Sequence, residues 1–325
     1  MSFDAAARDA LRFIRKVRPL AAAVESVPLA GEPFAPSSDP PILRAAEIIE
    51  GDEMRAIPVD RDIAVHEGFT GFLDGAQRMQ IIAQEDGIPI VLGTVSAAIR
   101  VRVDRRMQTW GRRPPVLERR LYMPFVYLDN SVADAAVPFE LVDTSEADYN
   151  GVVPSQHPAA LMERAVKKVQ DDRERAELSL AESWCESEDE PLFIDGGIGG
   201  SAAVATSGMA VGVVKSHRTL HAEGDALRTV LRLRAGQRSP VFRLTSRSRT
   251  SVASWYLRVR SADTRDAMWG LVRVEAPEED WSSDRANEIS AWVMRETSPL
   301  SLPDKRWDKM AYGVHDTEEF LRAIS

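Results

Sequence analysis

The sequence predicts a mixed α/β protein in which helices flank a central mixed sheet. Residues 88–103 are rich in Val, Ile and Thr, and Asp86-Gly87 precedes them between apolar runs, a pattern typical of an antiparallel hairpin. Residues 158–186 carry an apolar stripe at helical spacing with charged residues opposite it. Short apolar strands then alternate with helical segments up to the end of the chain.

The N-terminal part predicts a helix followed by an arm. Apolar residues between Met1 and Arg18 fall at helical spacing and are interrupted by charged residues, so this segment is an amphipathic helix rather than a signal peptide. The helix packs on the body of the protein or on a partner. The Pro-rich stretch from Pro28 to Pro41 predicts a linker or an arm along the surface.

The segment from Phe69 to Val103 predicts a three-strand antiparallel meander, with strands at 69–74, 78–83 and 88–103. Its first strand ends at Asp74. The basic segment from Arg100 to Arg120 contains Pro114-Pro115 and predicts a hairpin extension or loop, an Arg-rich insertion before a strand at 122–128.

The second half of the chain predicts a strand at 191–195 after the long helix, again ending in Asp-Gly. Later strands are expected at 209–215, 241–244, 254–259 and 270–275, and helices at 220–231, 283–296 and 317–324. The expected order of elements is three strands, a helix, two further strands and helices. An RNase H-like fold has the same order of elements.

Composition excludes several classes of protein. The 325 residues are 44% hydrophobic and 28% charged, which is ordinary globular composition and not that of a disordered or collagen-like chain. The single cysteine, Cys185, allows no intrachain disulfide and favours a cytoplasmic location. No segment approaches the ~18 apolar residues that a membrane span requires. The formal charge of −9 argues at first against a nucleic-acid partner.

Two aspartates are the main chemical signal. Asp74 and Asp195 each follow an apolar strand and precede a glycine, which lets another group approach closely. Carboxylates that converge on one point bind the hard ions Mg²⁺ and Mn²⁺, and a pair of such ions can hydrolyse a phosphodiester. Asp-Gly at a strand end is equally typical of a simple turn, so both interpretations stay open from the residues alone.

Several segments together resemble the NurA nuclease family, over roughly Gly68 to the C-terminus. The quoted segments are Phe72-Leu73-Asp74-Gly75, the helix from Arg173 to Ala181, Leu192-Phe-Ile-Asp195-Gly196, Val211-Gly-Val-Val-Lys215-Ser216, Trp255-Tyr-Leu-Arg258, Leu271-Val-Arg-Val-Glu275, Arg306–Val314 and Glu318–Arg322. The resemblance implies an RNase H-like nuclease domain at 66–325, preceded by the helix and Pro-rich arm at 1–65. It also implies a cytoplasmic, Mn²⁺- or Mg²⁺-dependent DNA nuclease with a two-metal site. Such a nuclease works as a homodimer beside a HerA-type hexameric ATPase in DNA end processing, repair or antiviral defence.

The resemblance also implies site residues. Asp74 and Asp195 match the two strand aspartates, and Glu177 matches the helix glutamate, with Glu174 and Glu182 as rivals. Lys215 matches the basic residue that ends the next strand, near the scissile phosphate. The late Ala-His helix motif of many family members is missing here. The candidates for the last metal-site position are Asp308 and His315.

The charge is unevenly distributed. Residues 211–273 contain 13 Lys and Arg against four acids, and residues 100–120 contain eight Arg against two acids. Arginines can contact a phosphate with two N–H groups at once, so one interpretation of these segments is that they form phosphate-binding surfaces. The alternative is that both segments form solvated surfaces whose charge is balanced by acidic helices. The DNA-binding candidates are Arg112, Arg113, Arg218, Arg243, Arg247, Arg249 and Arg258.

Other functions remain as alternatives. A catalytically silent DNA-binding or scaffold subunit of a HerA-type complex would have the same fold. Gly197 to Ala202 fits the dinucleotide pattern G-x-G-x-x-A, although Lys215 stands where an acidic residue would bind the ribose. His217 and His221 are spaced to share a metal, but a basic, phosphate-facing patch fits them better because no third ligand is evident.

Overall fold

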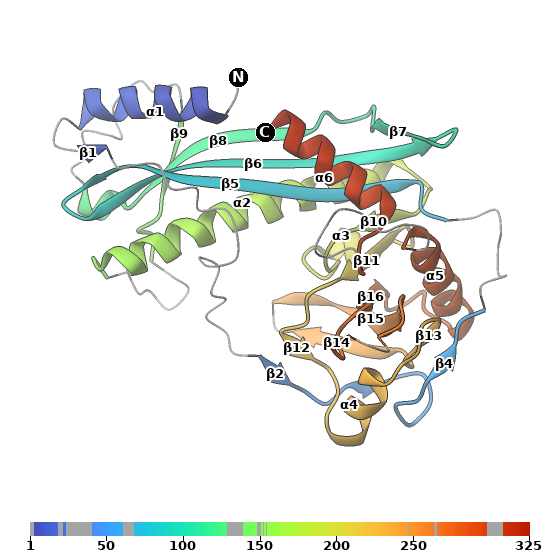
Figure 1. Cartoon of the computed structure of the whole chain (residues 1–325). Helices are drawn as coiled ribbons and strands as arrows, with labels where there is room; N and C mark the ends of the chain where they lie inside the picture. The colour runs from blue at the N-terminus through green and yellow to red at the C-terminus, as the bar shows by residue number, and fades with distance from the viewer. Residues whose placement is uncertain are drawn as a thin grey trace.

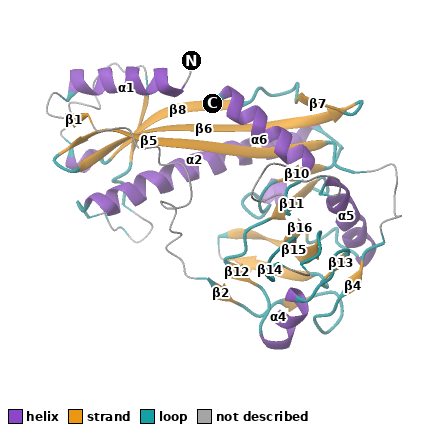
Figure 2. Ribbon diagram, in the orientation of Figure 1, coloured by secondary structure: helices purple, strands orange, loops and turns teal. Residues whose placement is uncertain are grey.

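The computed structural model describes residues 3–18, 22–23, 41–60, 68–128, 139–147, 151, 153, 155–246, 248–262, 265–297 and 308–325. The Pro-rich stretch up to residue 40 and the candidate Arg247 lie outside these residues. Figures 1 and 2 show long strands and their helices in one half of the molecule, and shorter strands with α4 and α5 in the other half. The mixed α/β class predicted from the sequence is confirmed.

Within the described residues, a mixed sheet of 14 strands runs through both halves. Its main path is β3-β14-β15-β16-β11-β10-β5-β6-β8-β9. The strands on this path are β3 (Glu47–Ile48), β5 (Gly71–Glu85), β6 (Ile88–Val103), β8 (Val116–Met123), β9 (Glu140–Asp143), β10 (Leu192–Ile194), β11 (Ala210–Val214), β14 (Phe242–Ser246), β15 (Arg249–Arg258) and β16 (Leu271–Pro277). Four short strands pair off this path: β1 (Ala22–Ala23) with β5, β7 (Arg106–Thr109) with β6, β13 (Gln237–Arg238) with β15, and β4 (Ile57–Pro58) with β13.

The expected three-strand meander at 69–103 is wrong. The segment forms two long antiparallel strands, β5 and β6, and the next strand of the meander is β8. Asp74 therefore lies inside β5, opposite Ala98, and does not end a strand. Gly75 does not interrupt β5. Its missing side chain leaves room for the side chain of Glu177.

Helices cover both faces of the long strands. The helix α2 (Pro158–Ser187) packs on the face of β5 that presents Leu73. The helices α1 (Phe3–Val17) and α6 (Tyr312–Ile324) pack on the opposite face, where Phe72 is buried in the same cluster as Val314. The helix α5 (Ser283–Glu296) packs in that cluster with residues of the shorter strands β11, β15 and β16. The predicted bounds of α5 are confirmed.

Some predicted bounds need correction. The helix α6 begins five residues before the predicted start at 317, and Gly313 in its first turn lies so close to the ring of Phe72 that a side chain there would clash. The strand expected at 122–128 ends at Met123 and continues as the 3-10 turn η1 (Phe125–Tyr127). The helix α4 (Gly224–Leu231) starts later than expected, and α3 (Ala202–Ala205) is a single turn.

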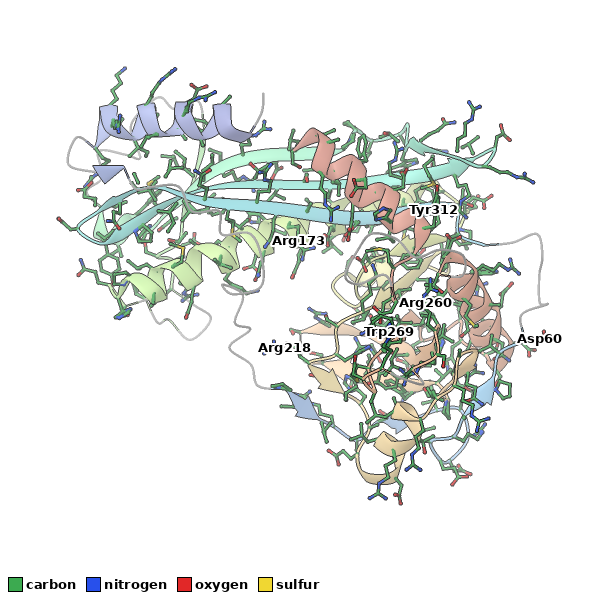
Figure 3. The ribbon with its side chains drawn as sticks, viewed as in Figure 1. Asp60, Arg173, Arg218, Arg260, Trp269 and Tyr312 are labelled. Atoms are coloured by element: carbon green, nitrogen blue, oxygen red, sulfur yellow. The ribbon has the colours of Figure 1, made fainter. Side chains whose placement is uncertain are left out.

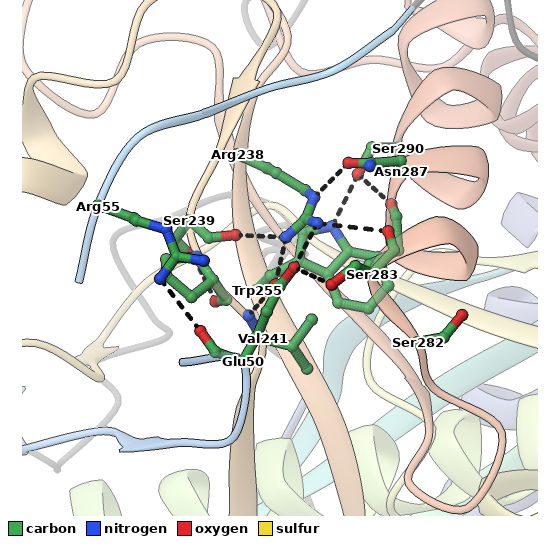
Figure 4. A network of polar contacts seen from close by, with 12 residues as sticks. Glu50, Arg55, Arg238, Ser239, Val241, Trp255, Ser282, Ser283, Asn287 and Ser290 are labelled. Atoms are coloured by element: carbon green, nitrogen blue, oxygen red, sulfur yellow. Dashed lines mark hydrogen bonds and ion pairs between the residues drawn. The ribbon is translucent and has the colours of Figure 1, made fainter. Parts of the chain in front are cut away.

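The described residues between 41 and 60 belong to the body of the protein. The strands β3 and β4 pair with β14 and β13, and β2 (Ile42–Leu43) pairs with β12 (Thr219–Leu220) in a separate two-stranded sheet. The buried carboxylate of Glu50 accepts two hydrogen bonds from the fully buried guanidinium of Arg238, at 2.6 and 2.8 Å (Figure 4). None of the helices in the described part of the chain has the length and apolar content of a membrane span.

Candidate metal and phosphate site

Asp74 and Asp195 lie side by side because their strands pair in parallel. Residues 71–73 of β5 align with residues 192–194 of β10, and the register continues to the two aspartates. The backbone N–H of Asp195 donates to the carbonyl of Leu73 at 3.1 Å. The two aspartate-bearing strands are therefore neighbours in the sheet.

A third carboxylate comes from α6. Single oxygens of Asp74, Asp195 and Glu318 all lie within 4.8 Å of one another, and we call these residues the three-acid group. Several contacts position α6 over β5. Asp316 accepts a 2.9 Å hydrogen bond from Arg100, and the Thr317 hydroxyl lies 3.5 Å from the carbonyl of Phe72.

Negative charge is concentrated in the three-acid group. Burial, followed by repulsion from Asp195, raises the pKa of the Asp74 carboxyl well above its usual range, although Lys215 opposes the shift. Glu318 and Glu177 add further repulsion. A group of buried carboxylates with a single nearby lysine favours the binding of a cation.

Lys215 follows β11 and reaches the group as predicted. Its Nζ donates to Oδ2 of Asp195 at 2.9 Å, and both side chains are largely buried. β11 lies next to β10 in parallel register, so Lys215 projects from the same end of the sheet as Asp195. The ammonium is therefore fixed beside the carboxylates, where it can contact a bound anion.

Glu177, the helix glutamate that the resemblance implied as a metal ligand, lies outside the three-acid group. Neighbouring residues of a strand face opposite sides of the sheet, so Asp74 faces α6 while Gly75 faces α2. Glu177 lies on α2 directly over Gly75 and forms an ion pair with Arg173. Burial is the main cause that raises the pKa of Glu177 to about 7, and the charge of Asp195 contributes. Of its rivals, Glu174 is exposed and Glu182 accepts a hydrogen bond from Ser201.

Neither Asp308 nor His315 belongs to the three-acid group, whose third carboxylate is that of Glu318. Asp308 is buried and accepts a 2.7 Å hydrogen bond from the backbone N–H of Gly270, so its role is structural. His315 lies on α6, and its Nδ1 is buried without a hydrogen-bond partner in the described part of the chain. The sequence contains one signal for Glu318, namely an acid on the helix stripe that otherwise holds the buried residues Val314, Thr317 and Leu321.

The arginine candidates have different surroundings. Arg258 is fully buried and donates to the carbonyls of Leu231, Leu233, Ala267 and Trp269, so the prediction that it binds DNA is wrong. Arg243 forms ion pairs with Glu47 and Glu278. Both guanidinium groups are thus engaged by other groups of the protein.

The remaining candidates are exposed to different degrees. Arg112 pairs with Glu188, and Arg113 donates to the hydroxyl groups of Ser179 and Ser183. Arg218 is exposed next to β12, in the half of the molecule with the shorter strands, whereas Arg173 lies on α2 in the other half (Figure 3). Arg249 is exposed at the start of β15, and no ion pair of Arg249 occurs among the described residues.

A pocket of about 400 Å³ adjoins the three-acid group on the α2 side of the sheet, and we call it the α2 pocket. Four carboxylates line it, those of Asp171, Glu174, Glu177 and Asp195. Three arginines, Arg173, Arg175 and Arg249, also line it. The apolar walls are Leu73, Leu178, Ala181, Ile194, Ile198 and Val204.

His217 and His221 do not form the basic patch expected from the sequence. Burial lowers the pKa of each imidazole to about 4, so both are neutral at pH 7. His217 lies 2.9 Å from the carbonyl of Leu271, and His221 stacks on Phe242. The glycine-rich segment after Asp195 leads into the single turn α3, which is too short to offer the helix N-terminus of a dinucleotide site.

Comparison with known proteins does not assign the chain to a family. No family model matches the sequence, and no curated protein is significantly similar to it. The geometry of the site is therefore the basis of the proposed function.

Proposed function

We propose that the protein is a metal-dependent DNA nuclease that hydrolyses phosphodiester bonds at the three-acid group. The observation that carries the proposal is the convergence of Asp74, Asp195 and Glu318 within 4.8 Å, with Lys215 Nζ 2.9 Å from Asp195. Converging carboxylates with a lysine beside them match what divalent-metal phosphodiester hydrolysis requires. A purely structural acidic cluster would not need three carboxylates to converge in a largely buried place.

The donor set fits Mg²⁺ or Mn²⁺. Every ligand atom in the three-acid group is a carboxylate oxygen, the donor type that these hard ions prefer. Burial and the charge of Asp195 raise the pKa of Asp74, and a bound cation would favour its ionised form. Asp74, Asp195 and Glu318 would hold one ion, and Asp195 with Glu177 would contribute to a second. A bound divalent ion supplies Lewis-acid activation of water and neutralises charge on the phosphate.

The protein's own residues bind and orient the substrate. Lys215, fixed by its contact with Asp195, would donate to a non-bridging phosphate oxygen as a point charge. Arg249 and Arg175 are exposed next to the site and would contact neighbouring phosphates of the same strand. The acidic total of −9 is compatible with this binding because the arginines act locally.

The sheet topology supports an RNase H-like nuclease. Along the strand order β8-β6-β5-β10-β11, β10 is parallel to β5 and to β11, and β6 is antiparallel to its neighbours. After the β5-β6-β8 meander the chain forms β9 and then the helix α2, which leads to β10. This order is compatible with an RNase H-like core, which the resemblance to the NurA family would imply. We propose on that resemblance that the nuclease is a cytoplasmic homodimer that acts beside a HerA-type hexameric ATPase.

The test is cleavage of end-labelled DNA by the purified chain with Mn²⁺ or Mg²⁺. The wild type is expected to cleave, and Asp74→Asn and Asp195→Asn are expected to fold but lose cleavage by about a hundredfold or more. Asp225→Asn is the matched control, since that side chain is exposed on α4, and it should cleave like the wild type. Binding of DNA by the wild type without cleavage under any divalent metal would instead indicate a silent DNA-binding subunit.

A further inference from the structure

A second hollow lies among the described residues, and we call it the arginine hollow. Its volume is about 370 Å³, within the range of about 300–1,000 Å³ that is typical of small-ligand sites. Its charged and aromatic lining residues are Arg102, Arg105, Trp292, Arg295, Glu296 and Tyr312. Tyr312 and Glu318 are separated by about 9 Å along the axis of α6, and no residue of the three-acid group lines the hollow. The hollow is therefore a separate site.

The lining of the arginine hollow has a surplus of positive charge. Both carboxylate oxygens of Glu296 accept hydrogen bonds from the guanidinium of Arg102, at 2.7 Å each, so these two charges cancel. The other charged residues of the lining are Arg105 and Arg295, and three arginines against one glutamate leave a charge of +2. Arg105 is exposed, and no ion pair of Arg105 occurs among the described residues. A phosphate monoester, with a charge of about −1.5 to −2 at pH 7, complements this lining.

The backbone at Arg105 is an independent sign of a binding role. Asp104 and Arg105 form the two-residue turn between β6 and β7, where Val103 pairs with Arg106. Both turn residues have a positive φ, 49° and 62°, in a kind of turn that favours glycine and asparagine. An arginine in this conformation is strained, whereas a glycine would not be. The turn thus keeps a charged side chain at the hollow at a cost in stability, which favours a role in binding over a role in folding.

The arginine hollow also offers an aromatic surface. Tyr312 begins α6 (Figure 3), and about half of this large residue is exposed, at 49%. Trp292 is buried behind it and makes an edge contact with the ring of Phe69. A base can stack on an exposed aromatic ring, and a phosphate alone would not use that surface. The lining therefore fits a ligand in which an aromatic ring is attached to a phosphate.

We propose that the arginine hollow binds a nucleoside phosphate, with the phosphate at Arg105 and Arg295 and the base against Tyr312. The ligand is a free nucleotide or the phosphorylated end of a DNA strand, since both present a phosphate monoester beside a base. The arginines supply the positive charge, so binding requires no divalent metal. The inference therefore goes beyond the proposed nuclease activity and does not depend on it.

The experiment measures binding of 2′-deoxyadenosine 5′-monophosphate to the full chain by isothermal titration calorimetry in EDTA. EDTA removes the divalent ions that would hold a phosphate at the three-acid group. Arg105→Gly removes the charge and relieves the strain, so it is expected to bind the nucleotide about tenfold more weakly while melting no lower than the wild type. Arg106→Gln is the matched control, since Arg106 is exposed on the same hairpin and does not line the hollow. It should bind like the wild type.

Further ligands distinguish the two sources. Tighter binding of a 5′-phosphorylated oligonucleotide than of its unphosphorylated form supports a strand end, and equal binding of the two supports a free nucleotide. Deoxyadenosine lacks the phosphate and should bind about tenfold more weakly than the monophosphate.

The inference is overturned if the wild type does not bind the nucleotide at millimolar concentration, or if Arg105→Gly binds it as tightly as the wild type. Nucleotide binding that depends on Arg105, together with no Mn²⁺-dependent cleavage, supports the arginine hollow and contradicts the proposed nuclease. Melting curves report folding, and Arg105→Asn replaces Arg105→Gly if the latter unfolds, since asparagine also tolerates a positive φ.

Discussion

Glu177 occupies the space that a side chain at residue 75 would need. A Cβ added to Gly75 would lie 2.0 Å from Oε1 of Glu177 and less than 3 Å from its Cδ and Cγ. The relationship couples the strand that carries Asp74 to the helix that carries Glu177. It explains why a glycine follows Asp74, although the chain makes no turn there.

Gly75→Ala is expected to displace the Glu177 carboxylate, because three of its side-chain atoms would clash with the added methyl group. If Glu177 assists at the site, cleavage should fall by about tenfold or more while the fold is kept. Gly111→Ala is the control, since a Cβ there has no neighbouring atom within 4 Å. Cleavage rates of the two variants decide the matter, and full activity of Gly75→Ala would remove Glu177 from the mechanism.

Two substitutions test which acid contributes to metal binding. Glu318→Gln changes the acid that lies in the three-acid group, and Asp308→Asn changes the acid that the sequence suggested. Because Glu318 contributes an oxygen to the group and Asp308 binds the N–H of Gly270, only Glu318→Gln should reduce Mn²⁺ affinity. At a metal concentration of 100 times Kd, Mn²⁺ should stabilise the wild type by about 2.7 kcal/mol. Thermal melting with and without Mn²⁺ measures this, and an equal metal response in wild type and Glu318→Gln would contradict the assignment.

His217 and His221 predict a pH dependence of stability. A histidine whose pKa is lowered from 6.5 to about 4 binds fewer protons in the folded state than in the unfolded state between these values. The free energy of unfolding should therefore fall as the pH drops from 6.5 towards 4. His221→Phe keeps an aromatic ring against Phe242 and should reduce the slope. Urea unfolding across this pH range tests it, and parallel curves for the two proteins would show that His221 does not contribute.

Arg238→Met should be strongly destabilising. The change leaves the carboxylate of Glu50 buried without its partner, which typically costs about 3–5 kcal/mol. Arg228→Gln removes a surface pair, with both side chains largely exposed, and should cost less than about 1 kcal/mol. Urea unfolding compares the two. A mild effect of Arg238→Met would mean that the network in Figure 4 contributes little to stability.

Local signals in the sequence were sufficient for much of the fold. The helix α5 starts where Ser282 accepts a hydrogen bond from the N–H of Arg285, a capping interaction within a few residues of sequence. Asp195 was expected at a strand end and lies there, because Leu192, Phe193 and Ile194 form a fully buried strand. Asp74 was expected at a strand end as well, but pairing with β6 extends β5 well past it.

Long-range contacts determined what the sequence could not show. Glu318 meets Asp74 only because α6 packs on β5 from the far end of the chain. Arg238 was counted among basic residues that favour phosphate, yet its partner Glu50 lies 188 residues away. Sequence shows how many charges a segment contains, and the tertiary structure decides which of them remain exposed to a ligand.

Anomalous diffraction from crystals grown with Mn²⁺ tests the central claim most directly, because it locates the ion independently of activity. We expect an anomalous peak in contact with carboxylate oxygens of Asp74, Asp195 and Glu318, and its loss in crystals of Asp195→Asn. A fully loaded Mn²⁺ site elsewhere on the protein, with no peak among these three carboxylates, would contradict the account.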